Sequence, residues 1–376
     1  MAEPMKNVFN REVIAAAADY LFGASTDFDK HRFVTLATDG LEALELKERS
    51  EQIHDALVVC LPDDYLAAVD VLLASLAVAL PEEPIPVEMP ASGIAGWMIM
   101  PMSLYVARHY GEHFQVAMAA LKELTKRFTS EFAIRYLIIS DQARAIDIFQ
   151  DWVRDENHHV RRLVSEGIRP RLPWAMQLPE LIREPRPILP LLDELKDDPS
   201  EYVRRSVANN LNDIAKDHPD LVAEIAAQWL EGASRDRERL VKHACRTLIK
   251  QGHPGTLSAF GYGRPALAEA MIEIRTPTVV FGNSLEFGVS LKSSGNKKQK
   301  LIIDYAVHFV KANGKLAPKV FKGRTVSLEG GAAFSFESKH PIKPITTRKY
   351  YAGPHKLEVL VNGESVAVAS FDLQVP

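Results

Sequence analysis

The sequence contains an internal repeat, and this repeat restricts the middle of the chain to a narrow class of folds. The segment Asp155–Val164 aligns with Asp198–Val207, and a third copy begins at Asp236. The equivalent valines, Val160, Val203 and Val241, are 43 and 38 residues apart. Repeats of about 40–47 residues are typical of HEAT-like pairs of helices.

Each copy supplies the second helix of such a pair. An amphipathic helix is predicted before each copy, at Ala143–Trp152, Pro187–Leu195 and Asp220–Trp229. An aspartate lies five residues before each equivalent valine, and aspartate is a good helix N-cap. The valine face of the second helix should be buried. Stacked pairs of this kind predict an α-solenoid with a concave face.

The periodicity of the chain changes once. Residues 1–275 predict helix almost throughout, because apolar residues recur at helical spacing between short breaks. Near Thr276 the pattern becomes one of short alternating segments, such as Leu285–Lys292 and Leu301–Val310, separated by Gly and Asn turns. About seven such segments indicate an antiparallel β-sandwich of the immunoglobulin type. We therefore expect a multidomain α + β chain, with a solenoid over 1–275 and a sandwich over 276–376.

Composition excludes several classes of protein. The chain is 47% hydrophobic and 25% charged, values that argue against disorder and against a disulfide scaffold. Cys60 and Cys245 each lie in an apolar helical pattern and are expected to be reduced core residues. The stretch Val69–Leu80 is too short for a membrane span, which needs about 20 residues. We expect a cytoplasmic protein without a membrane partner.

Charge is distributed unevenly along the chain. The net charge is −4, yet residues 1–100 carry 6 Lys and Arg against 17 Asp and Glu, whereas residues 276–376 carry 14 against 7. Phosphate binding depends on the local field rather than on the total charge. The basic final domain is therefore compatible with a nucleic-acid partner, and also with an ordinary solvated basic surface.

Superposing the copies, including a weaker one at residues 133–137, aligns a column of cationic side chains. This column contains Arg135, Arg162, Arg205 and His243, and Arg169, Asn209 and Asn212 follow within two turns. A ladder of donors about 8–10 Å apart could follow a phosphate backbone along the groove. The alternative is that these arginines bond to the loops of neighbouring repeats.

The residues after the first strong copy form an unusual linker. The stretch Ser165–Trp174 contains a helix ended by Pro170, then Arg171, then a tryptophan preceded by Pro173. Together with residues 41–49, 131–135 and 208–213, this stretch resembles the AlkC family of alkylpurine DNA glycosylases, bacterial HEAT-like-repeat proteins related to AlkD. The likeness covers nearly the whole helical region, and one AlkC subgroup carries a terminal immunoglobulin-like domain.

This resemblance implies a function in base-excision DNA repair. The family hydrolyses the N-glycosidic bond of cationic alkylated bases such as 3-methyladenine, and it captures the lesion in duplex DNA without full base flipping. No metal, cofactor or obligate protein partner is implied, and a monomer is expected. Because a cationic base is already a good leaving group, negative charge beside the sugar and a positioned water are what the site must supply.

Four residues are candidates for that chemistry. Glu166, which lies among arginines expected to keep it ionised, is assigned as the charge stabiliser, and Asp213 is the second candidate. Trp174 and Trp152 are candidates to contact the lesion, since indole faces attract cations. Each has an alternative: Glu166 could neutralise the arginines, Asp213 could be solvated, Trp152 could be core and Trp174 could brace its loop.

DNA contact is assigned to twelve residues. They are Arg135, His159, Arg162, Arg169, Arg171, Arg205, Asn209, Asn212, His243, Arg246, Lys322 and Arg324. His158 and His159 are adjacent but lack a third ligand at suitable spacing, so no metal site is predicted. The alternative function is a non-catalytic HEAT-repeat protein that binds DNA or a protein, which predicts no acidic group beside the ladder.

Overall fold

A computed structural model describes residues 4–79, 89–345 and 348–375, and the chain forms two compact units. The first unit is Met1–Asp217 and the second is His218–Pro376. The units differ from the predicted domains, because the last four helices belong to the same unit as the β-strands. Among the described residues, no helix has the length and apolar character needed to cross a bilayer.

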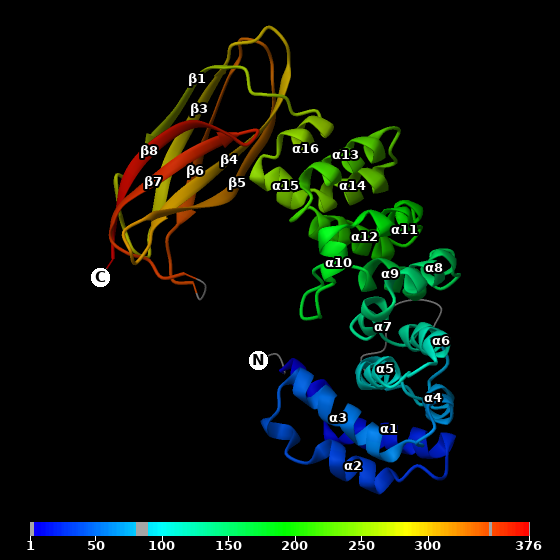
Figure 1. Cartoon of the computed structure of the whole chain (residues 1–376). Helices are drawn as coiled ribbons and strands as arrows, with labels where there is room; N and C mark the ends of the chain where they lie inside the picture. Colours follow the sequence, from blue (N-terminus) through cyan, green and yellow to red (C-terminus); the bar gives the residue numbers. More distant parts are fainter. Residues whose placement is uncertain (1–3, 80–88, 346–347, 376) are drawn as a thin grey trace. The chain divides into compact units, whose positions relative to one another are not determined.

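The first unit is built from stacked helices (Figure 1). They are α1 (Arg11–Ala24), α2 (Lys30–Thr38), α3 (Leu46–Cys60), α4 (Tyr65–Ala74), α5 (Ile99–Arg108), α6 (Phe114–Thr125), α7 (Ile134–Ser140), α8 (Gln142–Trp152), α9 (His158–Gly167), α10 (Pro179–Arg183), α11 (Leu189–Leu195) and α12 (Glu201–Ile214), with short 3-10 turns η1 (Met5–Val8), η2 (Leu41–Ala43), η3 (Gly96–Met98) and η4 (Arg186–Ile188). Helix α8 packs on α9, α11 packs on α12, and α9 packs on α12. This succession confirms the predicted helical repeats in the first unit.

The repeat appears in equivalent contacts as well as in equivalent helices. The valine faces of α9 and α12 are buried, as predicted, with Val160 and Val203 fully enclosed. Arg161 donates to the carbonyls of the residues five and six positions before it, and Arg204 does the same in the next copy. Arg161 also forms a two-point ion pair with Asp198, at 2.6 and 3.0 Å. One repeat is thereby bonded to the next.

The aspartates of the repeat do not cap the helices in the predicted way. Asp155 accepts the backbone N–H of Asn157, and Asn157 is the N-cap of α9. Asp198 similarly accepts the N–H of Ser200 ahead of α12. In these two copies the aspartate therefore shapes the loop before the helix, because it lies two residues ahead of the N-cap. In the third copy Ser234 is the N-cap, and Asp236 lies in the first turn of the helix that follows it.

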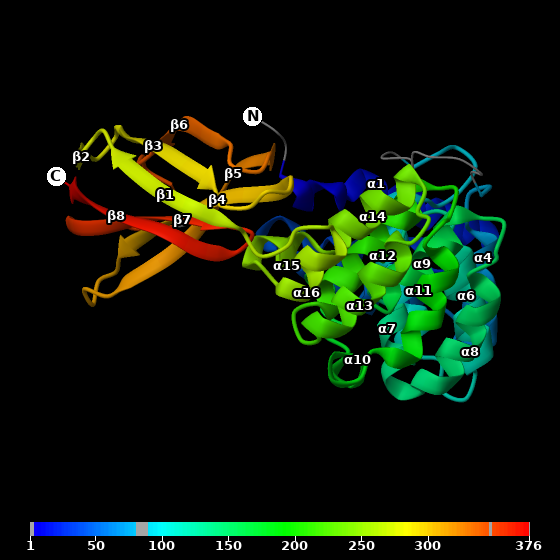
Figure 2. The same ribbon diagram turned by 90° about the horizontal axis from the view of Figure 1, so that it is seen from above.

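The second unit combines four helices with a β-sandwich. The helices are α13 (Pro219–Leu230), α14 (Arg235–Ala244), α15 (Arg246–Gln251) and α16 (Pro254–Ala259), and the strands are β1 (Leu267–Ile274), β2 (Thr278–Val280), β3 (Ser284–Ser293), β4 (Gln299–Val310), β5 (Leu316–Leu328), β6 (Ala333–Pro341), β7 (Gly353–Val361) and β8 (Glu364–Gln374). Figure 2 shows the two sheets as separate layers. Their strand orders are β1-β3-β6 and β2-β8-β7-β4-β5.

Strand β1 lies ahead of residue 276, where the sequence predicts the change from helix to strand. Its residues, rich in Ala, Leu, Glu and Met, have high helix propensity. Antiparallel pairing with β3 from Leu267↔Ser293 to Ile274↔Phe287 overrides that local preference. The short strand β2 pairs in parallel with β8, so the sandwich is antiparallel except at this edge.

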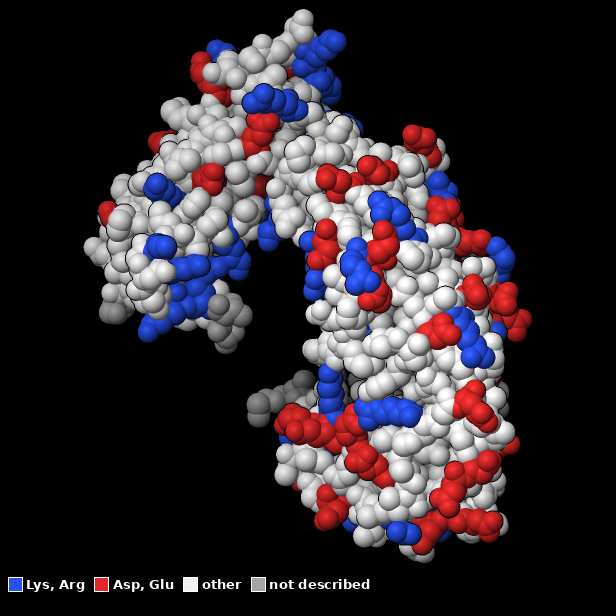
Figure 3. Space-filling view, viewed as in Figure 1, with Lys and Arg blue, Asp and Glu red and all other residues white. Residues whose placement is uncertain are grey.

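Alternating residues of the two sheets meet in one core. Phe287 of β3, Ile303 of β4 and Leu357 of β7 are each at most 1% exposed. The outward positions of β5 are basic and exposed, at Lys322 and Arg324. Figure 3 shows Lys and Arg side chains gathered on one side of the sandwich.

Two glycines join the sandwich to the helices of the second unit. Gly363, in the turn between β7 and β8, and Gly252, after α15, both have positive φ, and a Cβ on Gly363 would lie 2.3 Å from the Cα of Gly252. Side chains cannot be accommodated at this distance from a backbone. The contact therefore requires glycine for space as well as for conformation.

We expect Gly363→Ala to destabilise the second unit by at least 2 kcal/mol, because it adds a backbone clash to the cost of positive φ. Gly314→Ala is the matched control: Gly314 also has positive φ in a hairpin turn, but its Cβ would meet nothing within 4 Å. That control should lose about 1 kcal/mol. Equal losses in denaturant unfolding would contradict the packing role of Gly363.

Candidate functional site

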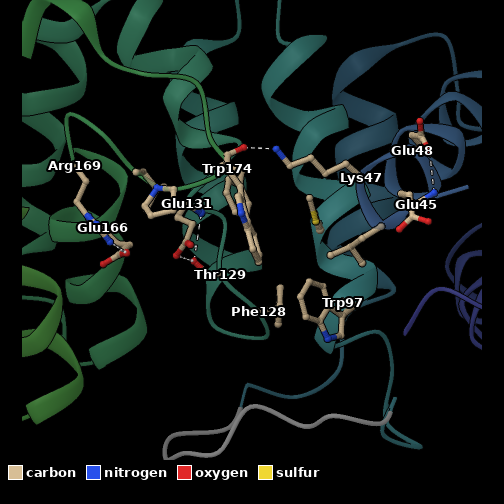
Figure 4. Close-up of a pocket in the computed structure, with 15 residues that line it drawn as sticks. Glu45, Lys47, Glu48, Trp97, Phe128, Thr129, Glu131, Glu166, Arg169 and Trp174 are labelled. Atoms are coloured by element: carbon tan, nitrogen blue, oxygen red, sulfur yellow. Dashed lines mark hydrogen bonds and ion pairs between the residues drawn. The ribbon is translucent and has the colours of Figure 1, made fainter. Parts of the chain in front are cut away.

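The first unit contains a pocket of about 720 Å³. It is lined by the start of α3, by η3 and α5, by the loop between α6 and α7, and by the end of α9 with the loop that follows it (Figure 4). The lining residues are Glu45, Leu46, Lys47, Glu48, Trp97, Met100, Phe128, Thr129, Glu131, Phe132, Glu166, Arg169, Leu172, Pro173 and Trp174. The wall thus combines aromatic side chains with four carboxylates.

Aromatic rings form two parts of this wall. Trp97 packs on Phe128, with ring centroids 4.8 Å apart, and edge-on against Phe9 at 6.3 Å. These contacts hold its ring rigidly. Trp174 is different: 70% of it is exposed, and its φ of +65° lies in the left-handed region that bulky residues rarely adopt. Core packing does not account for an exposed indole in this conformation, which makes Trp174 a candidate for a functional contact.

Two of the four carboxylates that line the pocket, Glu131 and Glu166, are buried. Glu166, near the end of α9, is 5% exposed and accepts from Arg169 Nη1 at 2.6 Å and from the Ser206 hydroxyl at 2.6 Å. Glu131, just before α7, is 9% exposed and accepts from the Thr129 hydroxyl at 2.8 Å. Both are therefore oriented by donors from the protein.

Arg162 connects these two carboxylates, and Arg169 connects Glu166 to Asp213. Arg162 Nη1 lies 2.5 Å from Glu131 Oε2, its Nη2 lies 3.5 Å from Glu166 Oε1, and its guanidinium stacks over Tyr202 at 5.0 Å. Burial disfavours the charged form of Arg162, but Glu131, Tyr202 and Glu166 outweigh burial and raise its pKa. Burial also disfavours the charged form of Arg169, but Glu166 and Asp213 outweigh burial and raise its pKa. Both arginines stay charged.

Asp213, the second predicted carboxylate, occupies a different place. It is 2% exposed and does not line the pocket. Its Oδ2 accepts from Arg169 Nε at 2.9 Å and its Oδ1 accepts from Lys216 at 2.8 Å. Asp213 is thus bonded to cations through both oxygens, and it holds the arginine that contacts Glu166. The alternative that Asp213 is a solvated surface residue is wrong.

Four of the residues assigned to DNA contact are buried, which argues against a direct phosphate contact at these positions: Arg135, His159, Arg169 and Asn212. Arg135 is fully buried and donates to three backbone carbonyls. His159 is 4% exposed and packs against His158 and Tyr202. Helical spacing alone could not reveal this. Aligning the repeats shows which residues are equivalent, but it does not show which of them another part of the chain buries.

The remaining predicted residues are distributed between core and surface. Trp152 is 5% exposed against Phe149 and lies outside the pocket lining, so its core alternative is correct. Asn212 is buried as well. Arg171 pairs with Asp217, and Arg205 with Glu201. Asn209 is half-buried, and four of the assigned residues are exposed in the second unit: His243, Arg246, Lys322 and Arg324.

Of the residues that line the pocket, Glu166, Arg169 and Trp174 were sequence candidates, whereas Glu131, Trp97 and Phe128 were among those that were not. Glu131 belongs to one of the segments that carry the family resemblance, and this was the available signal. Trp97 and Phe128 had none, because an aromatic residue in an apolar stretch is usually core. In the described residues, no group of three or more His, Cys, Asp or Glu is placed to hold a metal ion.

The fold and pocket define a helical-repeat protein with a carboxylate-lined aromatic site and an appended Ig-like domain. Uncharacterized protein YhaZ of Bacillus subtilis (strain 168) is 37% identical over 373 residues, 99% of each chain. The solved structure of Pseudomonas fluorescens alkylpurine DNA glycosylase AlkC, bound to DNA containing an abasic site analog, is 36% identical, with a TM-score of 0.84 over 99% of this chain and 100% of its own. A family model for the C-terminal Ig-like domain of uncharacterised protein YhaZ matches residues 268–375. The chain belongs to the AlkC family, in the subgroup with this C-terminal domain.

Protonation of His159 is expected to weaken the first unit. Burial, with the neighbouring His158 and Arg162, lowers the pKa of His159 to about 4. The unfolded chain therefore takes up a proton below pH 6.5 that the folded chain does not. Stability from this source is complete above pH 6.5 and is lost as the pH falls towards 4.

We predict that His159→Phe, which keeps a ring against Tyr202, loses less stability than the wild type when the pH falls from 7 to 5. The difference between the two losses in free energy of unfolding should be about 1–2 kcal/mol. Thermal unfolding at both pH values measures this. His31→Phe, at an exposed position of α2, is the control and should keep the pH dependence of the wild type. Identical pH dependence in His159→Phe and wild type would contradict the role assigned to His159.

Proposed function

We propose that this protein is a DNA glycosylase that removes cationic alkylated bases, of the 3-methyladenine type, from duplex DNA and leaves an abasic site. The observation that carries the proposal is the pair Glu131 and Glu166, held by buried arginines in a pocket beside the exposed Trp174. Membership of the AlkC family supports the same reaction class.

The chemistry follows from the charge of the substrate. An alkylated purine that carries a positive charge leaves with the electrons of the C1′–N bond, so it needs no strong general acid. The sugar becomes an oxocarbenium-like cation, which a nearby carboxylate stabilises. Water then adds to C1′, and its proton passes to a carboxylate or to solvent. We assign to Glu131 and Glu166 the roles of stabilising the cation and orienting that water.

The pocket also matches a planar cation in composition. Four carboxylates line it against two cationic side chains, Lys47 and Arg169, and four aromatic rings form its walls. Electron-rich indole faces attract cations, by about 0.5–2 kcal/mol per contact. Exposed groups such as Trp174 border the pocket, which is consistent with capture of a lesion at the surface of the duplex without full base flipping.

The same pocket favours hydrolysis without strand cleavage. A lyase step needs a free amine to attack C1′. Among the residues that line the described pocket, Lys47 is the single lysine, and its Nζ donates to the carbonyl of Trp174. We therefore propose a monofunctional enzyme whose product is an intact abasic strand.

We expect Glu131→Gln and Glu166→Gln each to slow the release of 3-methyladenine from methylated duplex DNA by about 10²–10³-fold, the usual cost of losing an electrostatic stabiliser. Single-turnover kinetics, with DNA binding measured in parallel, separates chemistry from affinity. Glu123→Gln is the matched control, because Glu123 also pairs with two cations but lies outside the pocket.

Two results would contradict the proposal in different ways. Absence of base release by the wild type, with DNA binding intact, would place the protein among non-catalytic DNA-binding repeat proteins. Equal loss in Glu123→Gln and in the two pocket variants would show that general destabilisation, and not the pocket carboxylates, governs the rate.

The basic side of the sandwich is proposed to contact the phosphate backbone. We expect Lys322→Ala combined with Arg324→Ala to reduce the salt dependence of DNA affinity, lowering the slope of log K against log salt by about 2. Fluorescence anisotropy at several salt concentrations measures this slope. Lys339→Ala removes an exposed lysine of the other sheet, where Lys339 pairs with Glu286, and this variant should leave the slope unchanged. An unchanged slope in the double variant would exclude this side of the sandwich from the interface.

A further inference from the structure

The loop between α9 and α10, residues 168–178, carries Trp174 into the pocket and is held at both ends. The N–H of Leu178 donates to the carbonyl of Pro170 at 3.1 Å, so the loop closes on itself. Within it, Trp174 adopts a φ of +65°. A bulky L-residue leaves this region unless the surrounding structure opposes the change. Some contact must therefore maintain the strained conformation.

Arg135 of α7 supplies the inner contact. Its Nη1 donates to the carbonyls of Gly167 and Arg169, both at 2.8 Å, and its Nε donates to the carbonyl of Met176 at 2.6 Å. The first two carbonyls precede Trp174 and the third follows it. One fully buried guanidinium thus bonds to both sides of the tryptophan. A lysine could not do this, because an ammonium lacks the planar fork.

Lys47 supplies the outer contact. It lies on α3 and is exposed, and its Nζ donates to the carbonyl of Trp174 itself (Figure 4). Close packing below the loop completes the arrangement: a Cβ on Gly167 would lie 2.7 Å from the Ile134 side chain, so the end of α9 lies directly on α7. The loop is fixed from the interior by Arg135 and from the surface by Lys47.

We propose that Arg135 and Lys47 are positioning residues that hold Trp174 in its strained conformation at the pocket. Arg135 acts through backbone carbonyls and touches no substrate, and it replaces the phosphate-binding role that the repeat pattern suggested. The consequence for catalysis rests on the proposed glycosylase function. The conformational part, that the loop opens when either contact is lost, is independent of the proposed function.

The conformational part is tested by limited digestion with chymotrypsin, with cleavage after Trp174 identified by mass spectrometry. Arg135→Lys should raise the rate of this cleavage about tenfold relative to cleavage elsewhere in the chain. Lys47→Met alters an exposed side chain and leaves the core intact, and it should raise the rate of cleavage after Trp174 to a smaller extent. Lys30→Met removes another exposed lysine, one that forms an ion pair with Asp19 on α1, and should have no effect.

The catalytic part is tested by a double-mutant cycle with Trp174→Ala, which reports coupling between contacting residues. Arg135→Lys should lower single-turnover base release about tenfold in the wild type and cause no further loss when Trp174 is already alanine. An equal loss in both backgrounds, or unchanged cleavage after Trp174, would overturn the proposal. If the wild type releases no base, the proposed function fails, while the digestion still decides whether these residues hold the loop.

Discussion

The buried ion pairs of Arg169 join two consecutive repeats, and the pocket depends on them. Arg169 contacts Glu166 on its own repeat and Asp213 on the next, at 2.6 and 2.9 Å, and all three side chains are less than 10% exposed. Removing one partner of such a pair usually costs about 3–5 kcal/mol, whereas a matched apolar replacement is often neutral. Stability alone therefore does not explain these charges. They hold a carboxylate in a defined orientation at the edge of the pocket.

Adjacent arginines of the repeat serve these two purposes separately. Arg161 donates to loop carbonyls and to the side chain of Asp198, and its equivalent Arg204 donates to the carbonyls of its own loop. This position of the repeat therefore maintains the stacking. Arg162, on another face of the same helix, contacts Glu131 and Tyr202. The first arginine of each pair thus makes the same contacts to loop carbonyls in both repeats, whereas the second arginine has different partners in each. Arg162 is paired with Glu131 beside the pocket, whereas its equivalent Arg205 is exposed and pairs with Glu201 of its own helix.

Much of the fold could be predicted because periodicity reports burial directly. The valine faces of α9 and α12 and the core strands β3, β4 and β7 appear where the patterns place them. Strand β1 could not be predicted, since its helix-forming residues take extended structure only through pairing with β3. For the site, Glu166 and Trp174 were predicted from the linker and the resemblance, and both line the pocket. Trp97 was not, because its role depends on Phe128 and Phe9, which are distant in the chain.

The sequence by itself determined the repeat, the two kinds of secondary structure and the presence of acidic and aromatic residues beside a proline-interrupted helix end. These follow from spacing and local chemistry, which act over a few residues. Tertiary structure decided which charges are exposed: Arg135 and His159 became interior, and Asp213 was bonded through both oxygens. The physical reason is that burial and ion pairing depend on the element packed against a side chain, and that element comes from elsewhere in the chain.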